Sequence, residues 1–492
     1  MINTEFRNAQ IVGPQKDYSH LVFARGYLIT DNEQALPSPH WERFEINGLH
    51  LAYDPRIQLA HATNGKCSIT LLGHAIDLVQ DTSNTTQIVK SLLENLNESR
   101  SDYFKELENL SGRYIIIDSG PKGTWIQSDA VALRSIYWNA ESRIIASHQN
   151  LVAETAGGLA VSVFGSAKWR SSNKAFSYPG NESHWEGVKF LNANHQLNIE
   201  TFEYSRIPMS APEPASLNEV AQRVLKMMRV QLKHLLKYPN PVVSLTAGQD
   251  SRTTLAALRP VKNSFHYFTY ALNYSRRLRA VKLDANDSVR IAKEMGLEHH
   301  HLMNIEGPLE NEKLARVLSR NSPKASNRNV AERYLIELEN DTMHIRSSFN
   351  EVAIAAYRTK YAPSVVTPEV LSDILTFETG YTIETLRATS SYMETTGILE
   401  VPGYDPLDLY YWELRMGSWL GNISHESDIA FDTHILINSR SIIRTLLSAP
   451  AKERGKGNIY HRIIQIAWPE LYSIPVNSVL QEFPETTVVD TK

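Results

Sequence analysis

The residues best suited to chemistry are Asp250 and Ser251, which follow a loop of small residues and open a helical pattern. Apolar residues at 242–245 predict a short strand, 246–249 form the loop, and 250–258 have helical spacing. Unpaired backbone N–H groups and the helix macrodipole favour an anion such as phosphate at a helix start. Asp250 adds a carboxylate that can hold Mg²⁺ against that phosphate. The alternative is that Asp250 and Ser251 only cap the helix.

The loop Thr246–Ser251 resembles the pyrophosphate loop of the ATP pyrophosphatase (PP-loop) superfamily, S-G-G-x-D-S, whose members split ATP into AMP and pyrophosphate. Thr246 stands for Ser and Ala247 for the first Gly, and a Cβ at Ala247 requires a negative φ. The chain contains neither the Walker pattern G-x-x-x-x-G-K-[ST] nor G-x-G-x-x-G.

Composition limits the classes of protein that fit. The 492 residues include 50 basic and 54 acidic side chains, a formal charge of −4, which argues against nucleic acid as a main partner. Cys67 is the single cysteine, which excludes intrachain disulfides and a cysteine-based metal site. The sequence has neither a secretory leader nor an apolar run approaching the ~18 residues that span a bilayer, so we expect a cytoplasmic protein without membrane contact.

The chain changes character at a proline-rich stretch. Residues 207–217 hold three prolines among small polar residues, which favours an exposed linker. Before it, short alternating strands and one helix near 86–97 predict an α+β domain of antiparallel sheets over 1–206. After it, helices alternate with apolar strands, and this order predicts an α/β domain with many helices over 218–492. The expected helices and strands are 114–117, 124–126, 135–138, 144–146, 217–236, 242–245, 265–270 and 287–295.

The resemblance extends over most of the chain. Gly112–Asp118 and the strands after it look like the glutaminase-type N-terminal domain of asparagine synthetases, and Tyr178–Asn192 is similar to the passage that joins the two domains of that family. Asp284 or Asp287, followed by Gly296, resembles the family's second nucleotide-domain helix. The resemblance implies an Ntn-hydrolase-like first domain and a PP-loop domain of the adenine nucleotide α-hydrolase type.

One departure concerns the glutaminase nucleophile. Glutamine-hydrolysing members begin with a cysteine whose own α-amine serves as the base, whereas this sequence reads Met1–Thr4 without a cysteine. Cys67 precedes the apolar strand 69–72, which favours a partly buried, inert thiol. The chain therefore resembles members without glutaminase chemistry, such as β-lactam synthetases and lasso peptide cyclases. We expect no glutamine hydrolysis.

The resemblance also implies the site. ATP and Mg²⁺ are the expected cofactors, Asp250, Ser251 and Glu351 the expected catalytic residues, and Asp250 and Glu351 the metal ligands. Glu351 falls where the family's later strand-loop motif has an acidic residue, although that motif's glycines are replaced by serine and alanine; the alternative is a carboxylate at a surface helix start. The implied nucleotide-binding residues are Ser244, Leu245, Thr246, Ala247, Gly248, Gln249, Thr269 and Ser347.

Candidate cations and aromatic residues are less specific. The family lysine near the departing pyrophosphate has no counterpart after Asn477. Lys452, Arg454 and Lys456 are the nearest alternatives, although a solvated loop is their usual interpretation. Residues 410–419 form either an aromatic substrate wall or a core-facing helix. Three further basic residues flank the Glu351 motif and are candidates for contact with phosphate or a substrate carboxylate: Arg346, Arg358 and Lys360.

These features together predict an ATP-dependent, AMP-forming amide synthetase. The substrate carboxylate, on a small molecule or a peptide, is adenylated, and ammonia or a substrate amine attacks it without glutamine hydrolysis. A non-catalytic nucleotide-binding relative with a regulatory or scaffold role is the alternative. A PP-loop enzyme acting on tRNA is opposed by the acidic charge balance. A homodimer is left open.

Overall fold

The structure is a computed structural model. It describes residues 16–475 except 34, 36, 173, 174, 176, 274–277, 325, 326 and 349, and it leaves the side chains of 172, 278–281 and 350 undescribed. Two segments considered in the sequence, Met1–Thr4 and the residues after Pro475, lie outside the described residues.

Two six-stranded antiparallel sheets form the first half of the molecule. Their strand orders are β10-β8-β9-β1-β3-β2 and β12-β11-β7-β6-β5-β4. The strands are β1 Tyr27–Thr30, β2 Glu42–Ile46, β3 Leu49–Tyr53, β4 Leu59–Thr63, β5 Ser68–Asp77, β6 Leu110–Gly120, β7 Gly123–Ser128, β8 Tyr137–Asn139, β9 Ile144–Ala146, β10 Lys189–Phe190, β11 His195–Asn198 and β12 Tyr204–Arg206. The short helices here are η1 Ser19–Leu21, α4 Gln149–Thr155 and α5 Ala167–Ser172.

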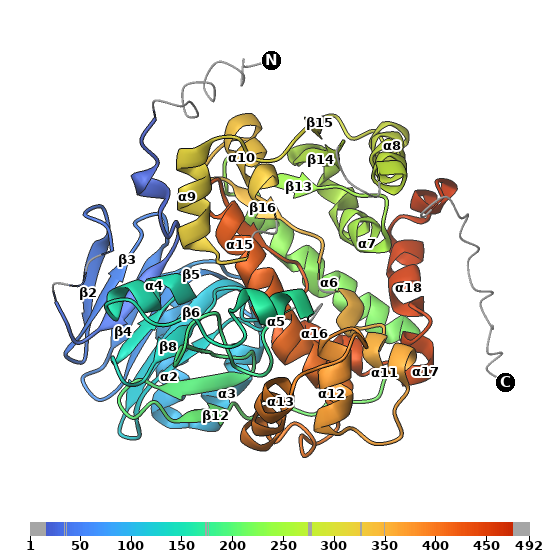
Figure 1. Cartoon of the computed structure of the whole chain (residues 1–492). Helices are drawn as coiled ribbons and strands as arrows, with labels where there is room; N and C mark the ends of the chain where they lie inside the picture. Colours follow the sequence, from blue (N-terminus) through green and yellow to red (C-terminus); the bar gives the residue numbers. More distant parts are fainter. Residues whose placement is uncertain are drawn as a thin grey trace.

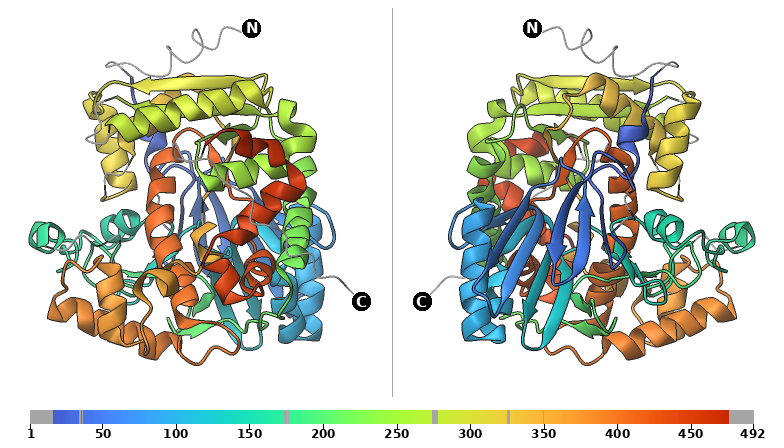
Figure 2. Two further views of the ribbon diagram at one scale, coloured as in Figure 1. Left: turned by 90° about the vertical axis from the view of Figure 1, so that its right-hand side faces the viewer. Right: turned by 90° about the vertical axis from the view of Figure 1, so that its left-hand side faces the viewer.

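Strand β6 explains why this half is layered. Ile115 and Ile117 pack with residues of the other sheet, whereas Tyr114 and Ile116 pack under helices α2 (Thr85–Glu98) and α3 (Arg100–Glu108). Alternate residues of a strand point to opposite faces, so a strand buried on both sides is apolar throughout. Figure 2 shows the two light-blue helices along the outer side of the sheets.

A five-stranded parallel sheet, in the order β15-β14-β13-β16-β17, organises the second half. The chain runs from β13 outward to β14 and β15 and then returns to place β16 on the opposite side of β13. The strand order therefore reverses between β13 and β16, which is where open parallel sheets bind ligands. The strands are β13 Val242–Ser244, β14 His266–Leu272, β15 His300–Ile305, β16 Met343–Ile345 and β17 Asp432–His434.

Helices surround this sheet (Figure 1). The first begins at a capping box of Ser216 and Glu219, so its start is encoded locally. The helices are α6 Leu217–Leu235, α7 Gln249–Leu258, η2 Arg259–Ser264, α8 Leu278–Glu294, α9 Glu312–Asn321, α10 Arg328–Glu337, η3 Asn350–Val352, α11 Ala356–Tyr361, α12 Pro368–Leu375, α13 Ile383–Thr396, α14 Pro406–Tyr410, η4 Tyr411–Leu420, α15 Gly421–Ser427, α16 Arg440–Leu447, α17 Ala451–Arg454, α18 Asn458–Ala467 and η5 Pro469–Ser473.

The predicted fold class is confirmed, with antiparallel sheets and helices first and a parallel sheet with many helices second. Several expected elements differ in extent; the strand expected at 114–117, for example, is β6, which spans Leu110–Gly120. The strand expected from residue 135 begins at Tyr137, because the Asp129 carboxylate accepts backbone N–H groups from Leu133 and Arg134 and holds the preceding residues in a turn. The helix expected at 287–295 is α8, which begins at Leu278.

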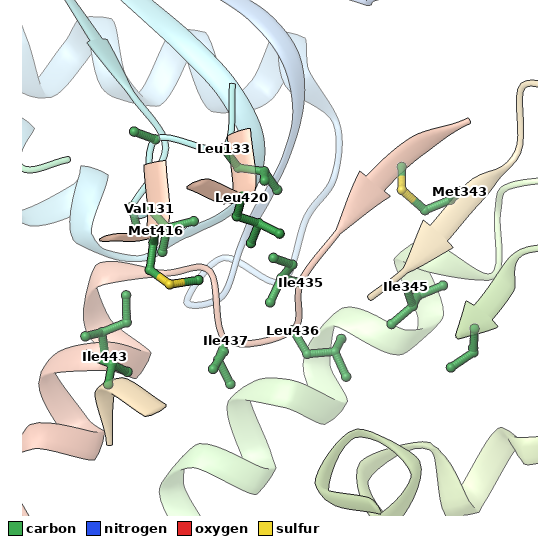
Figure 3. Close-up of a cluster of buried hydrophobic side chains, with 14 of the residues drawn as sticks. Val131, Leu133, Met343, Ile345, Met416, Leu420, Ile435, Leu436, Ile437 and Ile443 are labelled. Carbon is green, nitrogen blue, oxygen red and sulfur yellow. The ribbon is translucent and has the colours of Figure 1, made fainter. Parts of the chain in front are cut away.

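One hydrophobic core runs between the two halves. Figure 3 shows Val131 and Leu133, which follow β7, beside Met416 and Leu420 of η4. Residues 207–216 connect β12 to α6 without regular secondary structure. The proposed boundaries at 206 and 218 stay a prediction. Among the described residues, no helix combines the length and apolarity that a bilayer crossing requires.

Candidate active site

The loop after β13 is held in place by hydrogen bonds from its neighbours. Leu245 N–H donates to Phe268 O (2.8 Å), and Thr269 Oγ1 donates to Leu245 O (2.8 Å), which ties the loop to β14. Ser251 Oγ accepts the Thr246 N–H (3.0 Å) and lies 2.9 Å from Thr246 Oγ1. The loop that follows Ser244 is therefore preorganised.

Helix α7 begins without a side-chain cap. Its N-cap is Gly248, which has no side chain to accept a hydrogen bond from the first turn, and Asp250 and Ser251 lie inside the helix. The interpretation of these two residues as a simple N-cap pair is therefore wrong. The first intrahelical bond runs from Arg252 N–H to Gly248 O, so the N–H groups of residues 248–251 make no hydrogen bond with the described part of the chain.

Ala247 fits the loop although it replaces a glycine. Its φ is not positive, so its Cβ causes no backbone strain, and its side chain is buried. Its N–H donates to Asp284 Oδ1 (2.9 Å), and its carbonyl accepts from Arg252 Nε (2.8 Å). Asp284 of α8 thus holds the loop in place from a neighbouring helix. The sequence analysis did not predict this contact.

Two carboxylates distant in sequence lie close enough beside this loop for their charges to interact. Asp250 lies in the first turn of α7, and Glu351 lies in the turn η3 that follows β16. Burial and the nearby charge of Glu351 raise the pKa of Asp250 to about 7. Tyr411 OH donates to Glu351 Oε2 (2.8 Å). Because β13 and β16 are neighbours at the point where strand order reverses, the pair stands where parallel sheets bind ligands.

The residues after β16 complete this edge of the sheet. Ser347 Oγ is buried and has no hydrogen-bond partner among the described residues, and Arg346 is half-buried. Glu351 is solvent-exposed although its carboxylate is hydrogen-bonded, so a ligand can reach it. Paired carboxylates, an orphan hydroxyl and free N–H groups suit a divalent cation and a phosphate.

Two candidate cations have structural partners instead. Arg358 makes a bidentate ion pair with Asp405 (2.8 and 2.9 Å). Arg454 is buried and donates to Asp408 (2.7 Å), so its interpretation as part of a solvated loop is wrong. Three other basic residues remain near the surface: Lys360, Lys452 and Lys456.

Residues 410–419 divide between core and site. Tyr410 OH donates to Leu371 O (3.1 Å) and Trp412 Nε1 donates to Ala130 O (2.6 Å), so both belong to the core. Tyr411 instead reaches Glu351, a contact that no local sequence pattern indicated.

Comparisons with known proteins show only weak likeness. No family model and no curated protein matches the sequence. Several solved structures are partly similar, among them the following three. The allosteric regulatory enzyme of purine biosynthesis is 12% identical, with 59% of this chain and 77% of the other covered and a TM-score of 0.24. The glutamine phosphoribosylpyrophosphate amidotransferase from B. subtilis is 13% identical, with 70% of this chain and 87% of the other covered and a TM-score of 0.20.

The third structure is the glutamine-dependent NAD⁺ synthetase from Acinetobacter baumannii in complex with ADP. It is 10% identical to this chain, with 65% of this chain and 74% of the other covered and a TM-score of 0.18. Likeness at this level assigns no function, because one fold can serve many functions.

Cys67 lies away from this site. The residue is buried directly before β5, and its N–H donates to Asn64 Oδ1 (2.8 Å). Its thiol packs in the cluster under α2 and α3, as expected for an inert cysteine.

Proposed function

We propose that this protein is an ATP-dependent, AMP-forming amide synthetase. It would activate a carboxylate of a small molecule or peptide as an acyl-adenylate and pass it to ammonia or a substrate amine. The observation that carries this proposal is the meeting of Asp250 and Glu351 beside the uncapped start of α7.

The residues present fit Mg²⁺ and a pyrophosphate group. Asp250 and Glu351 would hold the metal, since Mg²⁺ is commonly bound by one or two carboxylates together with phosphate oxygens. A bound Mg²⁺ neutralises the charge that develops on the phosphates. The raised pKa of Asp250 supports this role, because two adjacent carboxylates are relieved by a cation.

The protein's own groups account for the remaining contacts. The N–H groups of Gly248, Gln249 and Asp250 would receive the pyrophosphate, and the Ser347 hydroxyl offers a further donor. Ser251 acts mainly by fixing Thr246, and Thr269 by fixing Leu245. A grip on the pyrophosphate leaves the α-phosphorus as the point of attack, which gives AMP rather than ADP.

The test is chromatography of the nucleotide products formed from ATP, Mg²⁺ and candidate carboxylate and amine substrates. We expect AMP and pyrophosphate from the wild type, no turnover with Asp250→Asn, and a loss of at least ~10²-fold with Glu351→Gln. Glu400→Gln is the matched control, because this glutamate is exposed and distant in sequence from the site. ADP as the main product would contradict the assignment. Measurable ATP affinity without any product would favour the non-catalytic relative.

Gly248→Ala separates ligand contact from folding. An added Cβ would meet only Thr246 Oγ1, at an ordinary 3.5 Å, and φ is −69°, so the loop itself tolerates alanine. A methyl group there would obstruct the approach of phosphate to the backbone. We expect an unchanged melting temperature and weaker ATP binding by calorimetry. Unchanged affinity would mean that the phosphate does not approach this loop.

A further inference from the structure

A cavity of about 250 Å³ lies where the two halves of the molecule meet. Strand β5 and residues at the start of α2 form one side of its lining, and the end of α6 with the residues that follow forms the other. Helix α6 leads into the start of β13, whereas the loop that carries Asp250 follows the end of β13. The cavity and the candidate active site therefore lie at opposite ends of that strand.

Two hydroxyl groups in the lining make no hydrogen bond with the part of the chain that the structure describes. They belong to Thr85, which is 2% exposed, and to Tyr238, which is partly buried. A buried hydroxyl without a partner carries a desolvation cost that a bound molecule removes. The cavity is much larger than one water molecule needs, so it has room for an organic ligand as that partner.

Lys237 places a positive charge at this cavity. Its Nζ donates to Ser83 Oγ (3.0 Å), lies 3.4 Å from His234 Nδ1, and forms no ion pair with a described residue. His234 Nε2 lies 3.0 Å from Asp81 Oδ1, so Nε2 carries a proton and Nδ1 is the acceptor of this neutral ring. An ammonium group has three N–H donors, so at least one of those on Lys237 is left for a ligand.

The inner wall adds a second positive charge. Gln231 Nε2 donates to two backbone carbonyls (3.1 and 2.7 Å), so its Oε1 must accept from His434 Nε2 (2.7 Å). His74 lines the cavity, with Nε2 3.1 Å from His434 Nδ1 and Nδ1 3.1 Å from the Asp432 carboxylate. One proton points to Gln231, one lies between the rings and one points to Asp432. The two rings therefore hold three protons and share one positive charge.

The carboxylates behind this wall do not balance its charge. Arg113 and Arg134 also donate to Asp432 (2.9 Å each), and Arg113 donates to Asp428 (2.8 Å). In this hydrogen-bonded cluster, three positive charges face two negative ones. Among the described residues that line the cavity there is no carboxylate. A bound anion would compensate the excess charge.

We propose that this cavity binds a small organic acid with one carboxylate and a short apolar body. Lys237 and the hydroxyls of Thr85 and Tyr238 would donate hydrogen bonds to the carboxylate. The apolar lining consists of Ala75, Ile76 and Leu235. An amino acid is disfavoured, because no lining carboxylate would receive its ammonium group. The site goes beyond the proposed function and needs no nucleotide.

The experiment compares para-fluorobenzoate with para-fluorobenzamide by fluorine NMR line broadening, using the full chain without ATP. The two probes have nearly the same shape and differ in charge. We expect saturable binding of the benzoate and much weaker binding of the benzamide. Propionate should displace the benzoate, whereas alanine, which adds an ammonium group, should not.

Three variants locate the binding. Lys237→Gln should weaken benzoate binding roughly tenfold, as expected for a lost hydrogen bond to a charged group, and Thr85→Val several-fold. Lys226→Gln should change it less than twofold. Lys226 is the matched control because it is exposed on α6 and carries the same charge, but does not line the cavity.

The outcomes decide the inference independently of AMP formation. Equal binding of the two probes, no binding of the benzoate, or equal effects of Lys237→Gln and Lys226→Gln would overturn it. Displacement by alanine as effective as displacement by propionate would overturn the assigned class of ligand. Both lysines are exposed, so their variants keep the test valid even if Thr85→Val fails to fold.

Discussion

Asp250 is the residue at which binding and stability are opposed. Burial disfavours ionisation of its carboxyl group, and the like charge of Glu351 disfavours it further. Strained electrostatics of this kind are common at functional sites, because the same groups are stabilised when a cation binds. The ligand-free protein therefore carries a penalty at neutral pH that a neutral side chain would remove.

Asp250→Asn is expected to stabilise the protein in EDTA at pH 8, with a rise of a few degrees in melting temperature. Below about pH 4 the carboxyl is protonated in both states. Between about pH 4 and 7 only the folded state keeps the proton, so stability falls as pH rises and the penalty is complete above pH 7. The gain should be smaller at pH 5, measured by calorimetry beside Glu400→Gln. An equal gain at both pH values would contradict the raised pKa.

At the scale of elements, one helical stretch serves two purposes. From Pro406 to Ser427 the chain passes through α14, η4 and α15, and the π-helical middle supplies both core and site. Tyr410 and its neighbour Tyr411 are both buried, but the Tyr411 hydroxyl donates to the Glu351 carboxylate. The Tyr411 hydroxyl is therefore the group that this stretch directs toward the site.

Tyr411→Phe is expected to lower AMP formation by roughly 10-fold or more while changing the melting temperature little, because it removes a hydrogen bond to a charged, solvent-accessible group. Tyr410→Phe is the matched control, for which we expect lower stability and unchanged activity per folded molecule. It leaves the buried Leu371 carbonyl without its hydrogen-bond donor. Pyrophosphate release and thermal unfolding measure the two effects. A loss of stability in Tyr411→Phe as large as that in Tyr410→Phe would assign Tyr411 a structural role only.

At the scale of the whole molecule, buried ion pairs join the two halves. Arg113 of β6 donates to Asp428 (2.8 Å) and Asp432 (2.9 Å), and Arg134 donates to Asp432 (2.9 Å). His74 lies between Asp432 and His434, at 3.1 Å from each. These bonds connect the antiparallel sheets to β17 of the parallel sheet, so the halves are expected to unfold together.

Arg113→Met is expected to lower the free energy of unfolding by about 3–5 kcal/mol, because Asp428 would remain buried without its cation. Arg290→Met is the control, since its ion pair with Glu294 is exposed and contributes about 0–1 kcal/mol. Urea unfolding followed by circular dichroism measures both. A loss below 1 kcal/mol for Arg113→Met would mean that water or rearrangement compensates the buried carboxylate.

Local signals were sufficient for the elements nearest the loop. The helix predicted at 217–236 is observed as α6, which begins at the Ser216 capping box, and small residues after a short apolar run predicted the strand, loop and helix of 242–258. These signals act within one or two turns of chain, so a sequence displays them directly. The resemblance to synthetases named Asp250 and Glu351 without showing that they meet.

Only the tertiary structure decided which of these residues come together. The parallel pairing of β13 with β16 places Glu351 near Asp250, and packing buries Arg454 against Asp408. The π-helix and the Tyr411 contact likewise depend on partners far away in the chain. The amino-acid sequence by itself determined the local elements and the candidate chemistry. The burial and charge environment of each group was decided by long-range packing, because these depend on neighbours that sequence spacing does not specify.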